Sequence, residues 1–266
     1  MQKRHRFGFA ALVAVALLPA AVALAAVSTH KSSVLLSPAG RGSATARCDS
    51  GERLVLGGFS TPSAGGSGIS VNTLNPISGS AWLARAVNFA GPGRLTSIAY
   101  CAQVGRLTRV VTKKPVPAGR LRAIVATCPR GASVRFGGYT SSADSYVGLV
   151  GLERPSARRW KVTAYADSDG PRTVSAVAMC GKGPAPVSVA RKTVTIAPDA
   201  QGTATVRCPR GRELALGGFA DAPFHPRAGD EGGPYVDGLE RTSPRSWTAR
   251  AYSFSAGRIT SIAYCR

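Results

Sequence analysis

Apolar and polar residues alternate along short stretches of this chain, with the period of two that indicates β-strands. Between positions 203 and 208, for example, Ala204, Val206 and Cys208 fall on one face and polar residues on the other. Gly and Pro interrupt the alternation at short intervals, and no stretch shows a helical period. In the last third of the chain the pattern predicts six strands, at 193–196, 203–208, 213–216, 235–240, 247–252 and 258–265. We therefore expect an all-β protein.

The same arrangement occurs three times. Each copy has an opening Cys, a Gly-Gly pair nine residues later, a single Trp and a closing Cys, and successive opening Cys residues are 80 positions apart. The copies are Cys48, Gly57-Gly58, Trp82 and Cys101; Cys128, Gly137-Gly138, Trp160 and Cys180; and Cys208, Gly217-Gly218, Trp247 and Cys265. All three Trp and all six Cys of the chain lie on this template, so we predict three β units at 32–103, 108–182 and 188–266.

The last predicted strand of each unit is apolar on both faces. In the third unit Ile259 and Ala263 alternate with Ile262 and Tyr264. A strand of this kind is more typical of the centre of a structure than of its surface.

Two architectures fit three such units. They could be small disulfide-stapled antiparallel sandwiches or partial barrels that follow one another in a row. Alternatively, three sheets could close around a pseudo-threefold axis, as in a β-prism. The joins between units are short, and Pro184 and Pro186 make the second one semi-rigid. Because known prisms use units shorter than 80 residues, we favour the row.

The cysteines are expected to form structural disulfides. Six cysteines allow 15 pairings, and strict repetition selects Cys48–Cys101, Cys128–Cys180 and Cys208–Cys265. Each loop encloses more than 50 residues, which corresponds to roughly 4 kcal/mol in the chain-entropy model. Zinc would need closer Cys or His spacings. A thiol nucleophile would need a His base, whereas we expect His30 in a disordered start and His225 in one loop.

The first residues predict an export signal. Lys3, Arg4 and Arg6 precede an apolar stretch at 7–24, and Ala23-Leu24-Ala25 ends it with small residues. This pattern predicts a signal peptide at 1–25, cleaved near Ala25 or Ala26; the alternative is an uncleaved membrane anchor. We expect a secreted or cell-wall-associated protein with no transmembrane segment after cleavage, in a compartment where disulfides form.

The chain is strongly basic, with a formal net charge of +21. Removing the three basic residues of the leader leaves +18, which favours anionic partners such as cell-wall polymers or acidic polysaccharides. A GC-rich genome would also produce many Arg residues without any selection for binding. No motif for sequence-specific nucleic-acid recognition is present.

Candidate binding residues lie on the strand faces opposite the Cys and Trp positions. Arg side chains beside Tyr could hold sulfate, phosphate or uronate groups and stack sugar rings; the alternative is a set of solvated side chains. The candidates are Arg47, Arg85, Tyr165, Arg207, Arg250 and Tyr252.

Catalytic and metal-binding signals are weak. Glu153 and Glu240 occupy matching places, but the first unit has Asn75 there, so we expect ion pairs at these positions. The third unit has an acidic, Gly-rich insertion in which Asp230, Glu231 and Asp237 are weak candidates for Ca²⁺. Its other members are Asp221 and His225. No known catalytic or phosphate-binding motif occurs, and we predict no catalytic residue and no cofactor.

On these residues the chain resembles secreted repeat proteins of GC-rich Gram-positive bacteria. Their repeats have a Cys-Pro-x-Gly start, a Gly-Gly-Phe or Gly-Gly-Tyr, a single Trp and an Ala-Tyr-Cys end, and the resemblance covers nearly all of 32–266. The chain departs from it at Cys48-Asp49 and at Ala178-Met179-Cys180. The resemblance implies export and disulfides but no activity. A fainter similarity is to the vitelline membrane outer layer proteins, which are three-sheet β-prisms, although the 80-residue period argues against it.

The sequence thus favours a secreted non-catalytic protein that contacts anionic cell-envelope polymers or glycans. One alternative is a structural or protein-binding envelope component. Another is a hydrolase that works from the acidic insertion between Asp221 and Glu240.

Overall fold

The computed structural model describes residues 27–61, 68–142, 147–166, 170–183, 186, 188–221 and 234–266. In these residues it contains eighteen β-strands and no helix, which confirms the all-β prediction. The first unit comprises β1 (Ser28–Leu36), β2 (Arg41–Arg47), β3 (Arg53–Ser60), β4 (Ile69–Ser78), β5 (Ala81–Asn88) and β6 (Gly93–Ala102). The second comprises β7 (Thr108–Val116), β8 (Leu121–Thr127), β9 (Ser133–Ser141), β10 (Val147–Ser156), β11 (Arg159–Ala166) and β12 (Arg172–Gly181). The third comprises β13 (Ser188–Ile196), β14 (Ala200–Arg207), β15 (Leu214–Asp221), β16 (Tyr235–Ser243), β17 (Ser246–Ser253) and β18 (Gly257–Cys265).

The strands form three antiparallel sheets of six, and each sheet is shared by two units. The orders are β1-β6-β3-β16-β17-β14, β2-β5-β4-β9-β12-β7 and β13-β18-β15-β10-β11-β8. In every sheet the first, sixth and third strands of one unit continue into the fourth, fifth and second strands of another. Each unit is therefore a small sandwich whose two layers belong to different sheets.

The three units close into a cycle and do not lie in a row. β4 of the first unit pairs with β9 of the second, β10 with β15 of the third, and β16 returns to β3 of the first. The favoured row was therefore wrong and the three-sheet closure was right, because the fourth strand of each unit pairs with a neighbour's third strand. We call these three junctions seams. Each is short, with Leu74 opposite Tyr139, Leu152 opposite Phe219 and Leu239 opposite Phe59.

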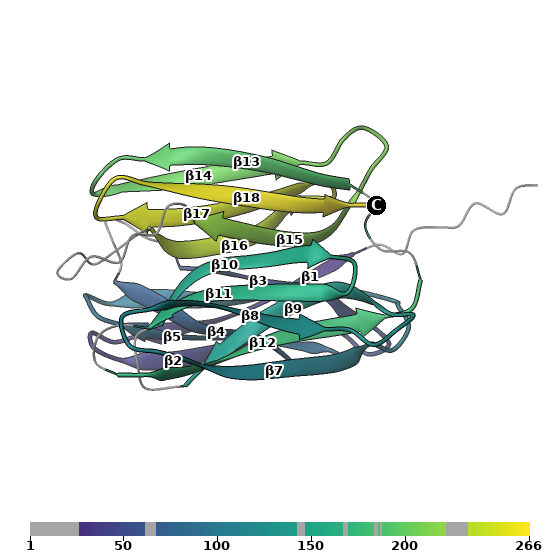
Figure 1. Cartoon of the computed structure of the whole chain (residues 1–266), viewed down its shortest axis with the longest axis horizontal. Coiled ribbons are helices and arrows are strands. Elements are labelled where there is room, and N and C mark those ends of the chain that lie inside the picture. The colour runs from purple at the N-terminus through teal and green to yellow at the C-terminus, as the bar shows by residue number, and fades with distance from the viewer. Residues whose placement is uncertain are drawn as a thin grey trace, which may run out of the picture.

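The register places equivalent ends of the three units at the same end of the molecule. Each closing Cys is paired at the start of its unit's first strand, as Cys101 is with Ser28. All three disulfides therefore lie at one end, which is the right-hand end in Figure 1, where β18 reaches the C-terminus. The third strands end and the fourth strands begin at the opposite end.

The first glycine of each Gly-Gly pair makes room for the unit's Trp. A Cβ atom added at Gly57 would lie 2.0 Å from the Trp82 ring, and the indole Nε1 donates a hydrogen bond of 3.0 Å to the carbonyl of Gly58. Trp160 and Trp247 make the same contacts in their units. All three indoles are buried, so this contact is the centre of each sandwich.

The second glycine makes room for the seam. A Cβ atom at Gly58 would lie 2.3 Å from the carbonyl oxygen of Leu239, and Gly138 and Gly218 face Leu74 and Leu152 in the same way. The pair lies within the third strand, and in all three units an irregularity in the pairing precedes it, as at Leu54 and Leu56. The glycines therefore serve two close approaches within one strand and do not end it.

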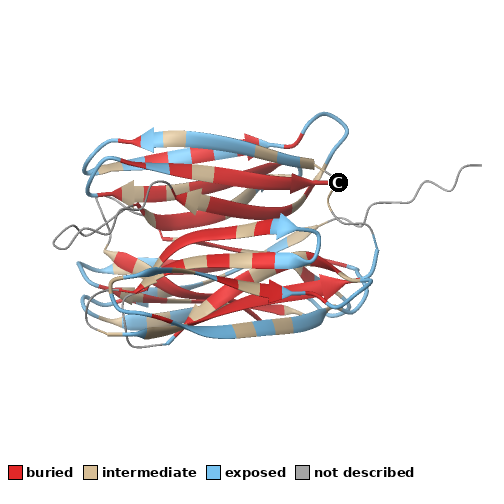
Figure 2. Cartoon of the chain, viewed as in Figure 1, coloured by how far each residue is buried: buried red, intermediate tan, exposed pale blue. Residues whose placement is uncertain are grey.

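The three predicted disulfides are confirmed. Cys48 follows β2 and Cys101 lies in β6, so each bridge links the two sheets that make up a sandwich. The last strands β6, β12 and β18 lie second from the edge of their sheets and are almost wholly buried, as predicted. Figure 2 shows β18 in red up to the C-terminus.

Candidate anion-binding pocket

The seams differ in the residue that lies across the second glycine. At the seam between the third and first units, the hydroxyl of Tyr100 accepts a hydrogen bond of 2.7 Å from the backbone N–H of Arg241. At the seam between the second and third units, the hydroxyl of Tyr264 accepts a bond of 2.6 Å from the N–H of Arg154. Burial raises the pKa of both tyrosines, so the hydroxyls stay neutral.

The seam between the first and second units cannot make this bond. The position equivalent to Arg154 and Arg241 is Pro76, which has no N–H to donate. The position of the tyrosine is Met179, which needs no hydrogen-bond partner. The second unit thus has Met179 in place of the repeat's Tyr, and the first unit has Pro76 in place of the residue that donates the N–H.

A pocket of about 330 Å³ lies at this altered seam, at the disulfide end of the molecule. Its lining comes from the start of β3, the end of β4 and the turn after it, the segment between the first two units, the start of β7 and the end of β12. The lining residues are Arg53, Ser78, Gly79, Arg106, Leu107, Arg109 and Met179. At the seam between the second and third units, the guanidinium of Arg154 lies 5.9 Å from the Tyr264 ring centre.

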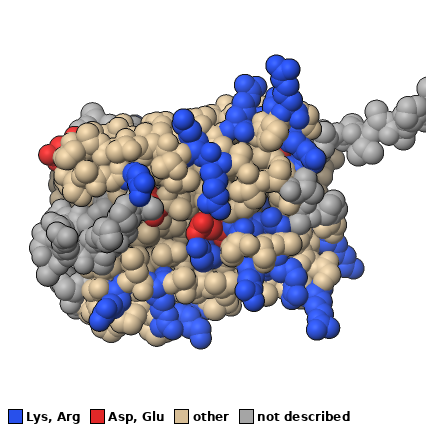
Figure 3. All heavy atoms as spheres, turned by 45° about the horizontal axis from the view of Figure 1, so that its top comes forward, with Lys and Arg blue, Asp and Glu red and all other residues tan. Residues whose placement is uncertain are grey.

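The charge of the pocket is positive and uncompensated. Arg109 Nη2 donates to Asn75 Oδ1 at 3.3 Å. Within the described part of the chain, neither Arg53, Arg106 nor Arg109 forms an ion pair with a carboxylate. Asn75 replaces a glutamate here, whereas Glu153 pairs with Lys161 and Arg191, and Glu240 pairs with Arg250. Figure 3 shows how few acidic side chains accompany the basic ones on the visible face.

This arrangement suits an oxyanion. Each guanidinium can donate two parallel hydrogen bonds to phosphate, sulfate or carboxylate. Leu107 and Met179 add an apolar wall against which the carbon part of a ligand could pack.

The binding residues predicted from the sequence do not come together in one group. Arg47 and Arg85 lie in one sheet, Tyr165 in the second, and the others in the third. Those others are Arg207, Arg250 and Tyr252. Arg250 is neutralised by Asp237 at 3.4 Å and Glu240 at 3.5 Å. Tyr252 packs edge-on against Phe254, with ring centres 4.9 Å apart.

The acidic insertion is only partly described. Asp230, Glu231 and His225 lie outside the described residues. Asp237 is 3 % exposed and accepts a hydrogen bond of 2.6 Å from Gln201 Nε2. It also pairs with Arg250, so these contacts indicate a structural role. Asp221 is buried, and burial raises its pKa well above the ordinary value.

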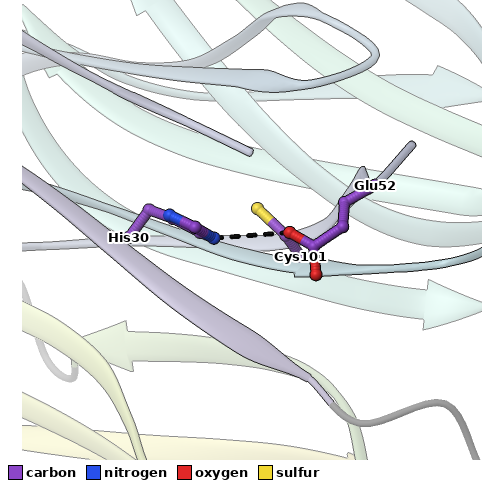
Figure 4. A group of neighbouring side chains, drawn as sticks. All are labelled: His30, Glu52 and Cys101. Carbon is purple, nitrogen blue, oxygen red and sulfur yellow. Dashed lines mark ion pairs between the residues drawn. The ribbon is translucent and has the colours of Figure 1, made fainter. Parts of the chain in front are cut away.

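One cluster brings metal-ligand residue types together, and its cysteine is not free. His30 Nε2 lies 3.3 Å from Glu52 Oε2 beside the sulfur of Cys101 (Figure 4). That sulfur is bonded to Cys48. His30 lies in β1, which begins four residues before the predicted start of the unit, so the expected disordered start was wrong.

Sequence reasoning missed Arg53, Arg106 and Arg109. The signal that could have indicated them is the set of departures from the repeat at Asn75, Pro76 and Met179. These residues lie in different units, and only the pairing of β4 with β9 brings them to one seam.

No protein-family model matches the chain, and no curated protein matches it by sequence. The described residues contain no helix of the length and hydrophobicity needed to cross a membrane. The three disulfides indicate an oxidising environment outside the cytoplasm.

Proposed function

We propose that this protein is a secreted, non-catalytic binding protein that holds anionic groups of a cell-envelope polymer or glycan. The observation that carries the proposal is the seam pocket, in which Arg53, Arg106 and Arg109 surround about 330 Å³ and no described carboxylate neutralises them. A desolvated oxyanion would offset the mutual repulsion of these three cations.

Export supports the same proposal. The leader predicted at 1–25 and the three disulfides suit a secreted or cell-wall-associated protein. Anionic polymers are abundant at the cell surface, and a net positive charge favours encounter with them.

The pocket lining favours binding over catalysis. Among its described residues there is no His, Asp, Glu, Lys or Cys that could act as a general acid, general base or strong nucleophile. Guanidinium groups position and neutralise anions but do not exchange protons near pH 7.

Titration calorimetry with three polyanions tests the proposal: long-chain polyphosphate, heparin and polygalacturonate. The variant Arg53→Gln/Arg106→Gln should weaken binding of the preferred polymer by about tenfold or more, because each lost charge-assisted bond contributes about 1.5–3 kcal/mol. The control Arg94→Gln/Arg120→Gln removes the same charge from exposed positions at the opposite end of the molecule. Equal losses of affinity in both variants would show that binding is general electrostatic attraction and would reject the pocket as the binding site.

Protein binding is the second candidate function, and an aromatic cluster favours it. At the end opposite the disulfides, Phe254 is 43 % exposed and contacts Tyr235 and Tyr252 edge-on. Phe89 is exposed at the matching place of the first unit. A partner at this surface would be retained at high salt, whereas a polyanion would be released.

A further inference from the structure

A second group of arginines lies at the disulfide end, around the pseudo-threefold axis. Arg154 on β10 and Arg241 on β16 occupy equivalent positions, and the third equivalent position is Pro76 on β4. The strands β4, β10 and β16 contact one another around the axis, and positions 76, 154 and 241 lie toward their disulfide ends. Arg135 on β9 and the C-terminal Arg266 complete the group, which we call the axial arginines.

Two of the axial arginines, Arg154 and Arg241, are partly withdrawn from water and incompletely bonded. Arg154 is only 8 % exposed. Its Nε, like that of Arg241, is buried without a hydrogen-bond partner among the described residues. A buried guanidinium donor without a hydrogen-bond partner lowers the stability of the fold. An acceptor atom of a ligand would therefore bind favourably here.

The carboxylates near the group leave it positively charged. Glu213 Oε2 lies 3.6 Å from Arg266 Nη2. Glu153 and Glu240, next to Arg154 and Arg241 in sequence, pair with Lys161 and Arg250.

Electrostatic effects agree with this geometry. Burial lowers the pKa of Arg135, Arg154 and Arg241. The nearby charge of Arg266 lowers the pKa of Arg135 further, and that of Arg135 acts in the same direction on the pKa of Arg154. Around Arg241, Glu213 raises the pKa and outweighs the smaller lowering by Arg266. Guanidinium groups that repel one another in a partly buried place favour an anion between them.

The axial arginines adjoin the seam pocket. Gly181 lies between the two, because a Cβ atom added there would be 2.7 Å from Leu107 of the pocket lining and 3.0 Å from Arg135 Nε. A ligand that leaves the pocket along Leu107 would therefore reach Arg135 next.

We infer that the axial arginines are a second anion subsite, and that the ligand is a linear polymer with repeated phosphate or sulfate groups that spans both subsites. This inference rests on the proposed function of the pocket and adds the form of its ligand. One anionic group would occupy the pocket, and a following group of the same chain would lie between Arg135, Arg154 and Arg241.

Tripolyphosphate and long-chain polyphosphate test the inference by calorimetry. The wild type should bind two tripolyphosphate ions, one in each subsite, but one long chain across both. The variant Arg154→Gln/Arg241→Gln should bind a single tripolyphosphate ion and should bind the long chain about tenfold more weakly. Its affinity for the long chain should also fall less steeply with salt, because fewer counterions are released.

A second variant covers the case in which Arg154→Gln impairs folding. Arg135→Gln/Arg266→Gln removes the same charge at more exposed positions and should have the same effects. Binding by both variants equal to that of Arg94→Gln/Arg120→Gln would overturn the inference and leave the pocket intact. Failure of the proposed function is a separate result: Arg53→Gln/Arg106→Gln would then bind polyphosphate as tightly as Arg94→Gln/Arg120→Gln does.

Discussion

At the scale of single residues, a backbone N–H decides which side chain can lie across a seam. Tyr100 and Tyr264 each accept a bond from an N–H, whereas the equivalent positions at the third seam are Met179 and Pro76. Met179 and Pro76 can be recognised in the sequence as departures from the repeat. Their meaning could not be predicted, because the facing residue belongs to another unit and becomes a neighbour only through the seam.

The first prediction concerns this hydrogen bond. Tyr264→Phe should lower the free energy of unfolding by about 1–3 kcal/mol, because it leaves the buried N–H of Arg154 without an acceptor. Met179→Leu is the matched control at the third seam and should cost less than about 1.5 kcal/mol. Urea unfolding measures both values, and an unchanged stability for Tyr264→Phe would contradict the role assigned to its hydroxyl.

The second prediction concerns the glycine under the indole. Gly57→Ala should destabilise the protein by at least about 1–3 kcal/mol, because the new methyl group would overlap the Trp82 ring. Gly105→Ala serves as the control, since nothing lies within 4 Å of its added Cβ atom. If the two variants unfold at the same urea concentration, the indole does not pack on Gly57 as described.

At the scale of elements, alternation and spacing were sufficient to predict six strands per unit, the pairing of the cysteines and the central place of the last strand. They were not sufficient to predict which strands pair across units. The fourth strand has the same alternation whichever third strand it joins, so its pattern fits a row and a cycle equally well. Only the second glycine carries a hint, since its missing side chain makes room for a carbonyl of another unit.

The third prediction concerns the bridge between the two layers of a unit. Replacing Cys48 and Cys101 by alanine should reduce the free energy of unfolding by roughly 4 kcal/mol, because the bridge closes a loop with a sequence separation of 53. Cys208 and Cys265 close a similar loop of 57, so their removal should have a similar effect. Denaturant unfolding without reductant gives both values, and a loss near zero for either pair would mean that the bridge does not constrain the unfolded chain.

At the scale of the whole molecule, the cycle makes each unit depend on the other two. The second unit gives β9 to one sheet and β10 to another, and both strands have their seam partners outside the unit. The arginines of the seam pocket and the axial arginines gather at one end for the same reason, because the cycle brings the disulfide ends of all three units together. The candidate residues on the outer strands were found from the sequence, but the pocket was not, since it exists only between units.

The fourth prediction follows from this dependence. Residues 108–182 expressed alone should not give a folded domain, because both seams of the second unit would be exposed. Dispersed backbone amide signals in a proton–nitrogen NMR spectrum, together with cooperative unfolding, would contradict this expectation. The full chain should unfold in one transition.

The most direct test of the account asks which arginines meet the anion. Arginine Nε–Hε NMR signals of the full chain should be followed during titration with tripolyphosphate, with Arg94 and Arg120 as internal controls. The account predicts that Arg53, Arg106 and Arg109 shift at low ligand concentration while the two controls stay unchanged. Shifts of similar size in all five signals would contradict it, because they would show that the anion is attracted to the basic surface in general and not held at the seam.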